Sequence, residues 1–542
     1  MGIYINSTEP YARYHDLLNS KWFVDKSNLI DEISAQIGSE HKYICITRPR
    51  RFGKTYAANM LAAYYVKNAG KDAHTLFDGL DVASTVNYES NINNYNVVFI
   101  DFSKCDDECS SYEEYIRSIK AILKDDLRSI FPNVQYREGG DVVEDFKRVF
   151  NETEQRFIFV LDEWDAVFHM SFIKDIEKQK YLLFLRNLLK DQAYVALAYM
   201  TGILPIAKYS SGSELNMFLE YTMAGESKYG EYFGFLDDEV NALYAIYSET
   251  EKLPSVTKND LELWYDGYRT MDGEKIYNPR SITAALTNNN LGNYWTSSGP
   301  YDEIFFYIKN NISDVKDDIA AMVSGEKVRC EAKEYAATSM NLTTRDEILS
   351  AMVVYGFLSY ENGYVSIPNR ELMKQFEDML VKQTDLGYVY RLAKESNRMV
   401  EATLNLQVDI MAEILEYAHD SESPVLDYNS EIELSSIVNL VYLSARDEYN
   451  IRREEKSGKG FVDFIFYPKN NIAKPGIILE LKVDESPEYA LNQIKEKKYV
   501  MRFKGGLAEE KSVDDILLVG INYDRKTKKH SCLMEKYNVG NN

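Results

Sequence analysis

The stretch from Tyr43 to Tyr65 constrains the fold of this chain most strongly. Its first residues, Tyr43-Ile-Cys-Ile46, are apolar and β-prone, a basic turn leads to Gly53-Lys54-Thr55, and the residues that follow have helical composition. Strand, Gly-Lys-Thr loop and helix form the layout of a phosphate-binding loop, because loop N–H groups and the helix dipole attract phosphate oxygens. In such a loop Lys54 reaches the β- and γ-phosphates and the Thr55 hydroxyl ligates Mg²⁺.

The loop departs from the pattern G-x-x-x-x-G-K-[ST], since Arg48 stands where the first glycine would be. Arginines therefore replace small residues that let such a loop wrap around phosphate. Two interpretations stay open: the arginines contact phosphate as charge-matched forks, or they fill the site. The predicted nucleotide-binding residues of the loop are Arg48, Arg50, Arg51, Phe52, Gly53, Lys54 and Thr55.

Length and composition predict a folded protein of several domains. The chain has 542 residues, of which 45% are hydrophobic, and domains usually take about 100–200 residues each. The longest apolar candidate for a membrane span, residues 193–207, is short and interrupted by Gly202 and Pro205, so no span is expected. The N-terminus has no signal-peptide pattern. The five scattered cysteines favour reduced thiols in a cytoplasm over a zinc site.

Charge is distributed unevenly along the chain. The net charge of −23 argues against a generic nucleic-acid coat. Residues 451–542, however, hold 18 Lys and Arg against 14 Asp and Glu, while the remainder holds 44 against 71. A locally basic C-terminal module could bind a polyanion, although most imbalances of this kind are solvated surface.

Apolar runs that alternate with helical stretches predict an α/β layer around the loop. Strands are expected at 95–102, 156–163 and 194–200, and helices at 111–131, 141–155 and 177–191. Continuous apolar strands of this kind are buried on both faces of a parallel sheet. Ligands on such sheets collect at the carboxyl ends of strands. Asp162-Glu163 and Thr201-Gly202 stand at such ends, as the Gly-Lys-Thr loop does.

The acids after the strand at 156–163 have the Walker B pattern. Asp162 is predicted to hold the Mg²⁺ of a bound nucleotide, and Glu163 to orient and deprotonate the attacking water. Thr201 is placed to sense the γ-phosphate, with a turn cap as the alternative. A strand that merely ends in surface acids is common, but the pairing with Gly53-Lys54-Thr55 favours nucleotide binding.

The chain from 236 to 400 is predicted to be mostly helical. A helix at 346–355 precedes two β-prone runs, which are joined by Asn362-Gly363, a hairpin turn signal. Helix and hairpin fit a small winged-helix-like unit and a plain structural hairpin equally well. Another helix is expected at 397–420 and a loop at 421–429. The predicted domains are therefore 1–235, 236–400 and 401–542.

The C-terminal part carries a second candidate site. Asp463 lies in a predicted strand at 460–467, and Glu480-Leu-Lys482 in the next, at 476–483. Alternation puts Glu480 and Lys482 on one face. Two carboxylates and a lysine suit metal-assisted phosphodiester hydrolysis: the acids bind Mg²⁺, the metal activates water, and the lysine positions that water or offsets charge. The motif alone is weak, because exposed strands often alternate acids and lysines.

The elements around this cluster add further groups. A helix at 486–503 and a strand at 516–522 are expected to follow it, and an amphipathic helix precedes it. That preceding helix carries Glu431 and Glu433, and periodicity does not choose between them.

At this point the chain resembles a known family, the bacterial and archaeal AAA-ATPase-like proteins with a C-terminal PD-(D/E)XK nuclease-superfamily domain. The resemblance covers nearly the whole chain. Besides the two sites, its ordered markers are Tyr265-Asp-Gly-Tyr268, Asn278-Pro279, Tyr294-Trp295, Gly356-Phe-Leu, Pro368-Asn369 and Gln493-x₃-Lys497-x-Tyr499. The Arg-Pro-Arg-Arg form of the loop looks like this family's own pattern.

The resemblance implies an AAA-like P-loop sheet with helices on both faces and a restriction-endonuclease-like α/β core. It implies ATP with Mg²⁺ at the first site and Mg²⁺ or Mn²⁺ at the second. Asp463, Glu480 and Lys482 carry over as the nuclease signature, with Glu431 as a further acid. Phe461 stands where the family usually has arginine, which puts a substrate contact in doubt.

The expected function is an ATP-dependent or ATP-gated nuclease that acts on DNA, with RNA as the alternative substrate, in defence or mobile-element control. A second interpretation is a regulatory NTPase switch whose C-terminal module binds nucleic acid or protein without cutting. A third is a scaffold with both sites silent. AAA-type ATPases often form rings, so a homo-oligomer is a candidate assembly.

Overall fold

The computed structural model describes the chain except residues 1, 68–70, 108, 207–213, 224–227, 271, 296–311, 332–343, 383–387, 421–430, 458–459, 470–473, 504–512, 514 and 539–542. The predicted loop at 421–429 thus lies outside the described residues. The chain forms two compact units, Met1–Ile304 with Arg329–Leu372, and Phe305–Val328 with Met373–Asn542. The division into 1–235, 236–400 and 401–542 stays a prediction. No helix in the described residues is long and apolar enough to cross a membrane.

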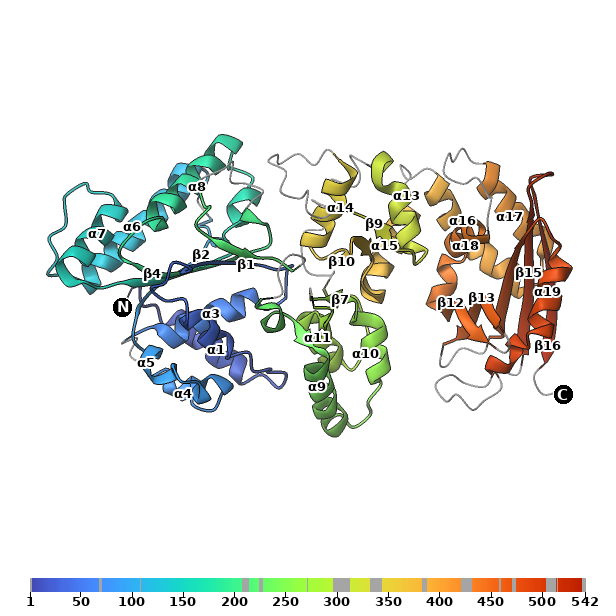
Figure 1. The fold of residues 1–542 in the computed structure, drawn as a ribbon, viewed down its shortest axis with the longest axis horizontal. Helices are drawn as coiled ribbons and strands as arrows, with labels where there is room; N and C mark the ends of the chain where they lie inside the picture. The colour runs from blue at the N-terminus through green and yellow to red at the C-terminus, as the bar shows by residue number, and fades with distance from the viewer. Residues whose placement is uncertain are drawn as a thin grey trace. The chain divides into compact units, whose positions relative to one another are not determined.

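A parallel sheet organises the first unit. Its described strands follow the order β2-β3-β4-β1-β5 (Figure 1), and each neighbouring pair is parallel. The strands are β1 Tyr43–Thr47, β2 Asn96–Asp101, β3 Phe157–Asp162, β4 Val195–Gly202 and β5 Leu219–Tyr221. This order places the end of β4 between the ends of β1 and β3, so the three predicted strand-end motifs lie side by side.

Helices cover both faces of this sheet (Figure 1). On one face lie α6 Tyr112–Ile130, α7 Val142–Thr153 and α8 Asp175–Leu189, and on the other α1 Glu9–Leu18, α2 Leu29–Ser34, α3 Lys54–Tyr65, α4 His74–Phe77 and α5 Tyr88–Asn91. Alternate residues of β3 enter opposite cores: Phe159 packs with the first set, Val160 with the second. Both faces are therefore apolar, which confirms the predicted parallel sheet with helices on both faces.

The region after the sheet is mostly helical, as predicted. A small sheet in the order β6-β8-β7 packs with helices around a core that contains Leu243, Tyr247 and Ile282. The elements are β6 Phe235–Leu236, α9 Asp237–Thr250, α10 Lys258–Tyr265, β7 Tyr268–Arg269, β8 Lys275–Tyr277 and α11 Pro279–Asn288. Further along the chain, α13 Ile312–Val323 belongs to the second unit, and β9 Val328–Arg329 joins a sheet in the order β10-β11-β9.

The predicted helix and hairpin are both present in the first unit. The helix is α14, Arg345–Val354, and the hairpin strands are β10 Ser359–Glu361 and β11 Tyr364–Ser366, which pair antiparallel. Asn362 (φ 52°) and Gly363 (φ 87°) adopt the left-handed conformations that an Asn-Gly hairpin turn requires.

The second unit contains a mixed sheet in the order β12-β13-β14-β15-β16, in which only the described pair β14–β15 is parallel. The strands are β12 Tyr449–Ser457, β13 Gly460–Pro468, β14 Gly476–Val483, β15 Asp515–Asp524 and β16 Lys529–Asn538. The sheet lies between α19, Pro487–Glu496, and a layer of three helices, α16 Tyr388–Leu404, α17 Val408–Asp420 and α18 Glu431–Val441 (Figure 1). The remaining helix, α15, runs from Arg370 to Lys382.

Two predicted helices in this part are wrong in extent. The helix expected at 397–420 is two helices, because Leu406 adopts a left-handed φ of 57° between α16 and α17. The helix expected at 486–503 ends at Glu496, and Lys498 (φ 58°) separates it from a 3₁₀ turn, Tyr499–Phe503. A residue with positive φ cannot continue a right-handed helix.

Candidate functional site

The loop between β1 and α3 has an unusual backbone. Arg51 (φ 67°) and Gly53 (φ 92°) both lie in the left-handed region. A Cβ on Gly53 would meet no described atom within 4 Å, so glycine is favoured there by conformation and not by space. A left-handed arginine is uncommon, and such residues cluster at ligand sites.

Lys54 is held by the loop itself. It is the first residue of α3 and is buried. Its Nζ donates hydrogen bonds to the carbonyl oxygens of Arg48 at 2.9 Å and Pro49 at 3.1 Å. The ammonium group therefore stays at the loop, where a phosphate would compete with two neutral acceptors for a charge-assisted hydrogen bond.

Asp162, Thr55 and Thr201 are brought together, although β4 is distant from the loop in sequence. The Thr201 hydroxyl donates a hydrogen bond to Asp162 Oδ1. Burial raises the pKa of Asp162, and the hydroxyls of Thr201 and Thr55 oppose this. Asp162 Oδ2 is buried and has no hydrogen-bond partner among the described residues. Burial of a carboxylate oxygen without a hydrogen bond destabilises the folded state. A divalent cation bound beside Thr55 would coordinate this oxygen and remove that cost.

Glu163 follows directly and faces the cavity beside the loop. It has a positive φ of 52°, a conformation that few residues without a short polar side chain adopt. Burial raises the pKa of its carboxyl, while the charges of Lys54 and Arg50 lower it. A carboxyl poised in this way is suited to accept a proton from water.

Asp165 is a residue that sequence reasoning missed. Its Oδ2 accepts hydrogen bonds from the backbone N–H groups of Ile203 at 2.9 Å and Leu204 at 2.8 Å. A Cβ on Gly202 would lie 2.5 Å from the Trp164 ring and 2.7 Å from Asp165 Oδ1. Asp165 thus ties the end of β4 to the turn after β3. The only available signal was an acid three residues beyond Asp162.

Arg48 points away from the cavity. Its Nη1 donates to the carbonyl oxygens of Thr47 at 2.8 Å and Tyr221 at 2.9 Å, and its guanidinium lies 5.3 Å from the Phe233 ring centre. Burial lowers the pKa of Arg48 to about 10. For Arg48 the filling interpretation fits, since the residue joins β5 to the loop and its guanidinium is not placed to contact phosphate.

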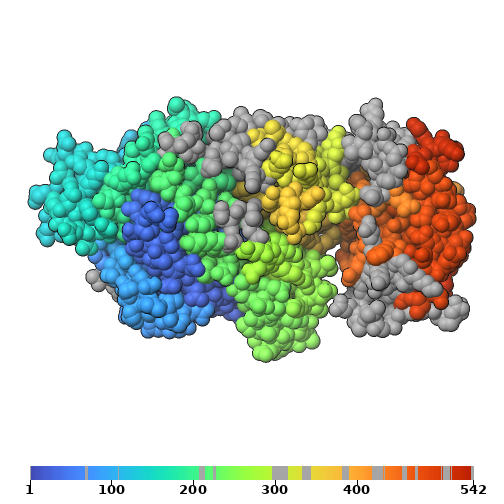
Figure 2. Space-filling model, viewed as in Figure 1, coloured from blue at the N-terminus to red at the C-terminus, as the bar shows by residue number. Residues whose placement is uncertain are grey.

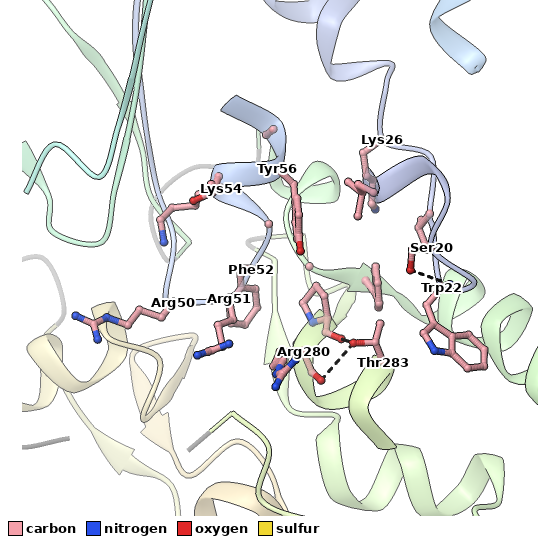
Figure 3. Close-up of a pocket in the computed structure, with 18 of the residues that line it drawn as sticks. Ser20, Trp22, Lys26, Arg50, Arg51, Phe52, Lys54, Tyr56, Arg280 and Thr283 are labelled. Atoms are coloured by element: carbon pink, nitrogen blue, oxygen red, sulfur yellow. Dashed lines mark hydrogen bonds between the residues drawn. The ribbon is translucent and has the colours of Figure 1, made fainter. Parts of the chain in front are cut away.

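The other two loop arginines line a cavity of about 1010 Å³ (Figure 3). A site of this size accommodates a small molecule. In Figure 3, Trp22 lies on the opposite side of the cavity from Arg50 and Lys54. Basic donors at one side and aromatic surface at the other suit a ligand with phosphates and a base. For Arg50 and Arg51 the phosphate-contact interpretation stays open.

Sequence reasoning also missed the walls of this cavity opposite the loop. They come from the N-terminal segment and α11, which are joined by a hydrogen bond from Trp22 Nε1 to Thr287 Oγ1 at 2.7 Å. Lys26 Nζ lies 2.5 Å from Glu239 Oε1. In the space-filling view, N-terminal residues (dark blue) and those around 240–290 (light green) meet on the surface of the first unit (Figure 2). The lining side chains of these walls include Tyr14, Leu17, Phe23, Phe235, Arg280 and Thr283.

The second predicted cluster is assembled on β13 and β14. Asp463 Oδ2 accepts a hydrogen bond from the Leu481 N–H at 2.7 Å. Lys482 Nζ lies 3.2 Å from Glu480 Oε1 and 3.3 Å from Glu431 Oε1. Gln493 of α19 donates to Glu480 Oε1. The structure therefore brings Asp463, Glu480, Lys482 and Glu431 together.

The electrostatics of this cluster fit a divalent cation. Burial and the neighbouring Asp463 raise the pKa of Glu480, and Lys482 opposes them. Glu480 Oε2 is buried without a hydrogen-bond partner in the described part of the chain. Among the described residues no group of three or more His, Cys, Asp or Glu forms a metal cage. Asp463 and Glu480 would thus hold a cation that keeps several waters, as Mg²⁺ commonly does.

The raised pKa of Glu480 predicts a pH effect on folding. The protonated carboxyl stabilises the folded state fully below the unfolded-state pKa of about 4.3, and this contribution is lost as pH rises through the higher folded-state pKa. Without divalent cations, the free energy of unfolding of the native protein should therefore fall relative to Glu480→Gln as pH increases from about 4.3. Urea titrations of both proteins across this range measure the difference.

Two controls sharpen this test. Glu485→Gln makes the same substitution at an exposed glutamate just beyond β14 and controls for the change of residue type. Saturating Mg²⁺ should reverse the trend, because a cation selects the ionised carboxylate. A pH-independent difference between the native protein and Glu480→Gln would contradict the raised pKa.

Two family models match parts of the chain. Residues 13–211 match the family model for AAA-ATPase-like proteins, described as a predicted AAA-ATPase. Residues 433–531 match the PD-(D/E)XK nuclease superfamily. The chain joins an AAA-ATPase-like domain to a PD-(D/E)XK nuclease-superfamily domain. The first match contains Lys54, Asp162 and Thr201, and the second contains Asp463 and Glu480.

The similar solved structures are distant from this chain. A Walker-type ATPase of Pyrococcus abyssi is 12% identical with a TM-score of 0.38, over 65% of this chain and 94% of that one. Cdc6p of Pyrobaculum aerophilum is 11% identical with a TM-score of 0.28, over 65% and 92%. The ORC2 protein of Aeropyrum pernix is 12% identical with a TM-score of 0.33, over 65% and 91%. No curated protein matches the chain. Similarities this distant carry no argument about function.

Proposed function

We propose that this protein is an ATP-dependent nuclease that cleaves DNA with Mg²⁺. The observation that carries the proposal is the cluster on β14, where Lys482 contacts Glu480 and Glu431 and a buried Glu480 oxygen has no hydrogen-bond partner among the described residues. A buried carboxylate with an unused oxygen is a costly feature for a merely structural site. The same chain carries the Gly53-Lys54-Thr55 loop and the Asp162-Glu163 pair. A nucleotide site and a cation site in one chain support an ATPase activity that is coupled to a nuclease activity.

At the first site, the residues act on a nucleotide as follows. The Lys54 ammonium exchanges its hydrogen bonds to two carbonyl oxygens for hydrogen bonds to the β- and γ-phosphates. Thr55 and Asp162 would hold Mg²⁺, which supplies charge neutralisation at the phosphates. Thr201 keeps Asp162 oriented through its hydroxyl. Glu163 accepts the proton of the attacking water.

At the second site, Asp463 and Glu480 would hold the divalent cation, which supplies an activated water and Lewis acidity. Gln493 and Lys482 orient Glu480 through its Oε1. The Lys482 ammonium offsets negative charge that develops on the phosphate. Asp463 is fixed by the Leu481 N–H, so the two acids are held on paired strands.

A regulatory switch without cleavage is the second candidate function. The observation in its favour is Phe461, which is 64% exposed beside the cluster on β13 and stands where an arginine is usual. The cluster thus lacks one cation that would attract phosphate. In this alternative, ATP binding controls what the C-terminal domain binds.

The test is a cleavage assay with linear, circular and single-stranded DNA, in Mg²⁺ or Mn²⁺, with and without ATP, for the native protein and Glu163→Gln. We expect cleavage by the native protein only with both a divalent cation and ATP. Glu163→Gln should bind ATP with unchanged affinity but hydrolyse it about 100-fold more slowly, because a general base contributes roughly 10²–10⁴-fold. If this variant still cleaves DNA, ATP binding alone permits cleavage. If it does not, cleavage requires ATP hydrolysis.

Two outcomes would contradict the proposal. Absence of cleavage of every DNA substrate, with ATP hydrolysis intact, would favour the switch. Normal hydrolysis by Glu163→Gln would remove Glu163 as the base. Glu154→Gln serves as a matched control, since Glu154 also has a positive φ, 56°, but follows α7 and does not line the cavity.

A further inference from the structure

The back of the nucleotide loop is held by residues far away in the sequence. The Arg50 carbonyl oxygen accepts hydrogen bonds from Trp295 Nε1 at 3.0 Å and from Asn278 Nδ2 at 3.5 Å. The Phe52 carbonyl oxygen accepts one from the Gly234 N–H at 3.1 Å. These donors belong to the region after the parallel sheet, so that region fixes the conformation of the loop.

Trp295 is itself fixed by a buried carboxylate at the start of α15. Glu371 is 2% exposed. Its Oε1 accepts the Trp295 N–H at 2.6 Å, and its Oε2 accepts the Ser281 hydroxyl at 2.7 Å. Burial of a carboxylate is expensive without strong hydrogen bonds. The two carboxylate oxygens of Glu371 therefore orient Trp295 and the first turn of α11.

The two hydrogen-bond partners of Glu371 are each connected to a residue that lines the cavity. Trp295 contacts the Arg50 carbonyl, and Arg50 lines the cavity. Ser281 directly follows Arg280, whose side chain also lines the cavity (Figure 3). A single carboxylate therefore positions two arginine-bearing segments on which an anionic ligand would depend.

Other sequence markers outside the loop pack behind it in the same way. The Tyr268 hydroxyl donates to the Gly356 carbonyl oxygen at 2.6 Å, and its ring packs edge-on against Phe52, with ring centres 5.2 Å apart. A Cβ on Gly356 would lie 2.7 Å from the Pro49 side chain. The loop is thus supported from behind by close contacts, and Glu371 is the buried charge within that support.

We propose that Glu371 is a positioning residue for nucleotide binding and turnover, acting on the loop through Trp295 and on Arg280 through Ser281. This inference rests on the proposed use of ATP at the same cavity. Glu371 hydrogen-bonds Trp295 and Ser281, so its removal should reach the loop through Trp295 and Arg280 through Ser281.

The test compares Glu371→Gln, Trp295→Phe and the double variant. Glutamine keeps the shape of Glu371 but turns an N–H₂ group toward one of the two donors, and phenylalanine keeps an aromatic ring but removes the bond to the Arg50 carbonyl. Each single change should raise the KM for ATP about 3- to 10-fold, the size of one lost hydrogen bond. Because Glu371 reaches the loop through Trp295, adding Glu371→Gln to Trp295→Phe should raise the KM further only by the part that reaches Arg280 through Ser281, and so by less than the product of the two single effects.

Hydrogen exchange of the loop amides provides a readout that needs no ATP. In Glu371→Gln, exchange at the amides of residues 48 and 50–53 should be faster than in the native protein by about 3- to 10-fold, while the amides of β3 stay unchanged. The matched control is Glu377→Gln, a second buried glutamate on α15 that pairs with Arg446 at 2.9 Å. This control should lower the melting temperature without changing KM or loop exchange.

The outcomes separate the two proposals. Unchanged loop exchange in Glu371→Gln, or an equal change in Glu377→Gln, would overturn the positioning role. Faster loop exchange in a protein that fails to bind a fluorescent ATP analogue would uphold the positioning role and overturn the use of ATP. Additive losses in the double variant would show that Glu371 does not act through Trp295.

Discussion

Replacement of Lys54 with alanine should weaken ATP binding by about 100-fold, since a hydrogen bond to a charged group is worth about 1.5–3 kcal/mol. The Lys54 ammonium is buried at the loop, 2.9 Å from the Arg48 carbonyl oxygen and 3.1 Å from that of Pro49. In the complex these acceptors would be exchanged for phosphate oxygens, which carry full charge. Titration with a fluorescent ATP analogue measures the affinity, and phosphate release measures the expected loss of turnover.

The control for this variant is Lys178→Ala. Lys178 is also a buried lysine, paired with Asp175 at 3.1 Å on α8, and it does not line the cavity. It should leave ATP affinity within about twofold of the native value while it changes stability by about 1 kcal/mol. If Lys54→Ala binds ATP as the native protein does, the assignment of the loop to phosphate fails.

Replacement of Asp463 should abolish DNA cleavage and leave ATP hydrolysis intact. Loss of a cation ligand removes the activated water, so the expected decrease in the rate of cleavage is about 100- to 1000-fold, of the order seen when a main electrostatic group is removed. Asp463→Ala also leaves the Leu481 N–H without its acceptor, at a cost of about 1–3 kcal/mol in stability. Asp463→Asn keeps an acceptor for this N–H and separates the chemical effect from the structural one.

Asp484→Ala is the matched control for this second prediction. Asp484 directly follows β14 and pairs with Arg525 at the surface, with Oδ2 2.6 Å from Nε. Its removal should leave the rate of cleavage within about twofold of the native rate, because this ion pair is exposed and such pairs contribute little. If Asp463→Asn cleaves DNA at the native rate, the cation is held elsewhere.

The interior strands of both large sheets could be predicted from the sequence, but only one of the four edge strands could. That edge strand, β2, has an apolar run at 97–100 that is buried, like those of the interior strands. Apolar runs of β-prone residues identified β1, β3, β4, β13 and β14, because these strands are covered on both faces. The strands that were missed in these sheets are β5, β12 and β16, and each lies at an edge. An edge strand gains its pairing from one neighbour only, so its sequence needs no long apolar pattern. In β12, five consecutive charged residues, 452–456, hide the strand completely.

In the candidate sites too, residues within short motifs could be predicted from the sequence, and residues whose roles depend on distant contacts could not. Lys54, Thr55, Asp162 and Glu163 follow strand ends in short motifs, and the two-residue alternation of β14 predicted that Glu480 and Lys482 share a face. Asp165, Glu371 and the Trp22 side of the cavity form no motif with the loop. Their roles depend on contacts across many residues, such as Trp295 with Arg50, which no spacing in the sequence encodes. Arg48 was placed in the loop correctly, but the direction of its side chain depends on the missed strand β5.

The charged residues of β12 also limit how copies of this protein could associate. A free sheet edge attracts another strand, and rows of lysine and glutamate on an edge discourage such pairing because the charges would have to be desolvated and matched. The opposite edge strand, β16, carries Lys529, Glu535 and Lys536. Extension of the C-terminal sheet from one copy into the next is therefore disfavoured on both sides. A ring or dimer built through the C-terminal domain would therefore use its helix and loop surfaces and not the edges of this sheet.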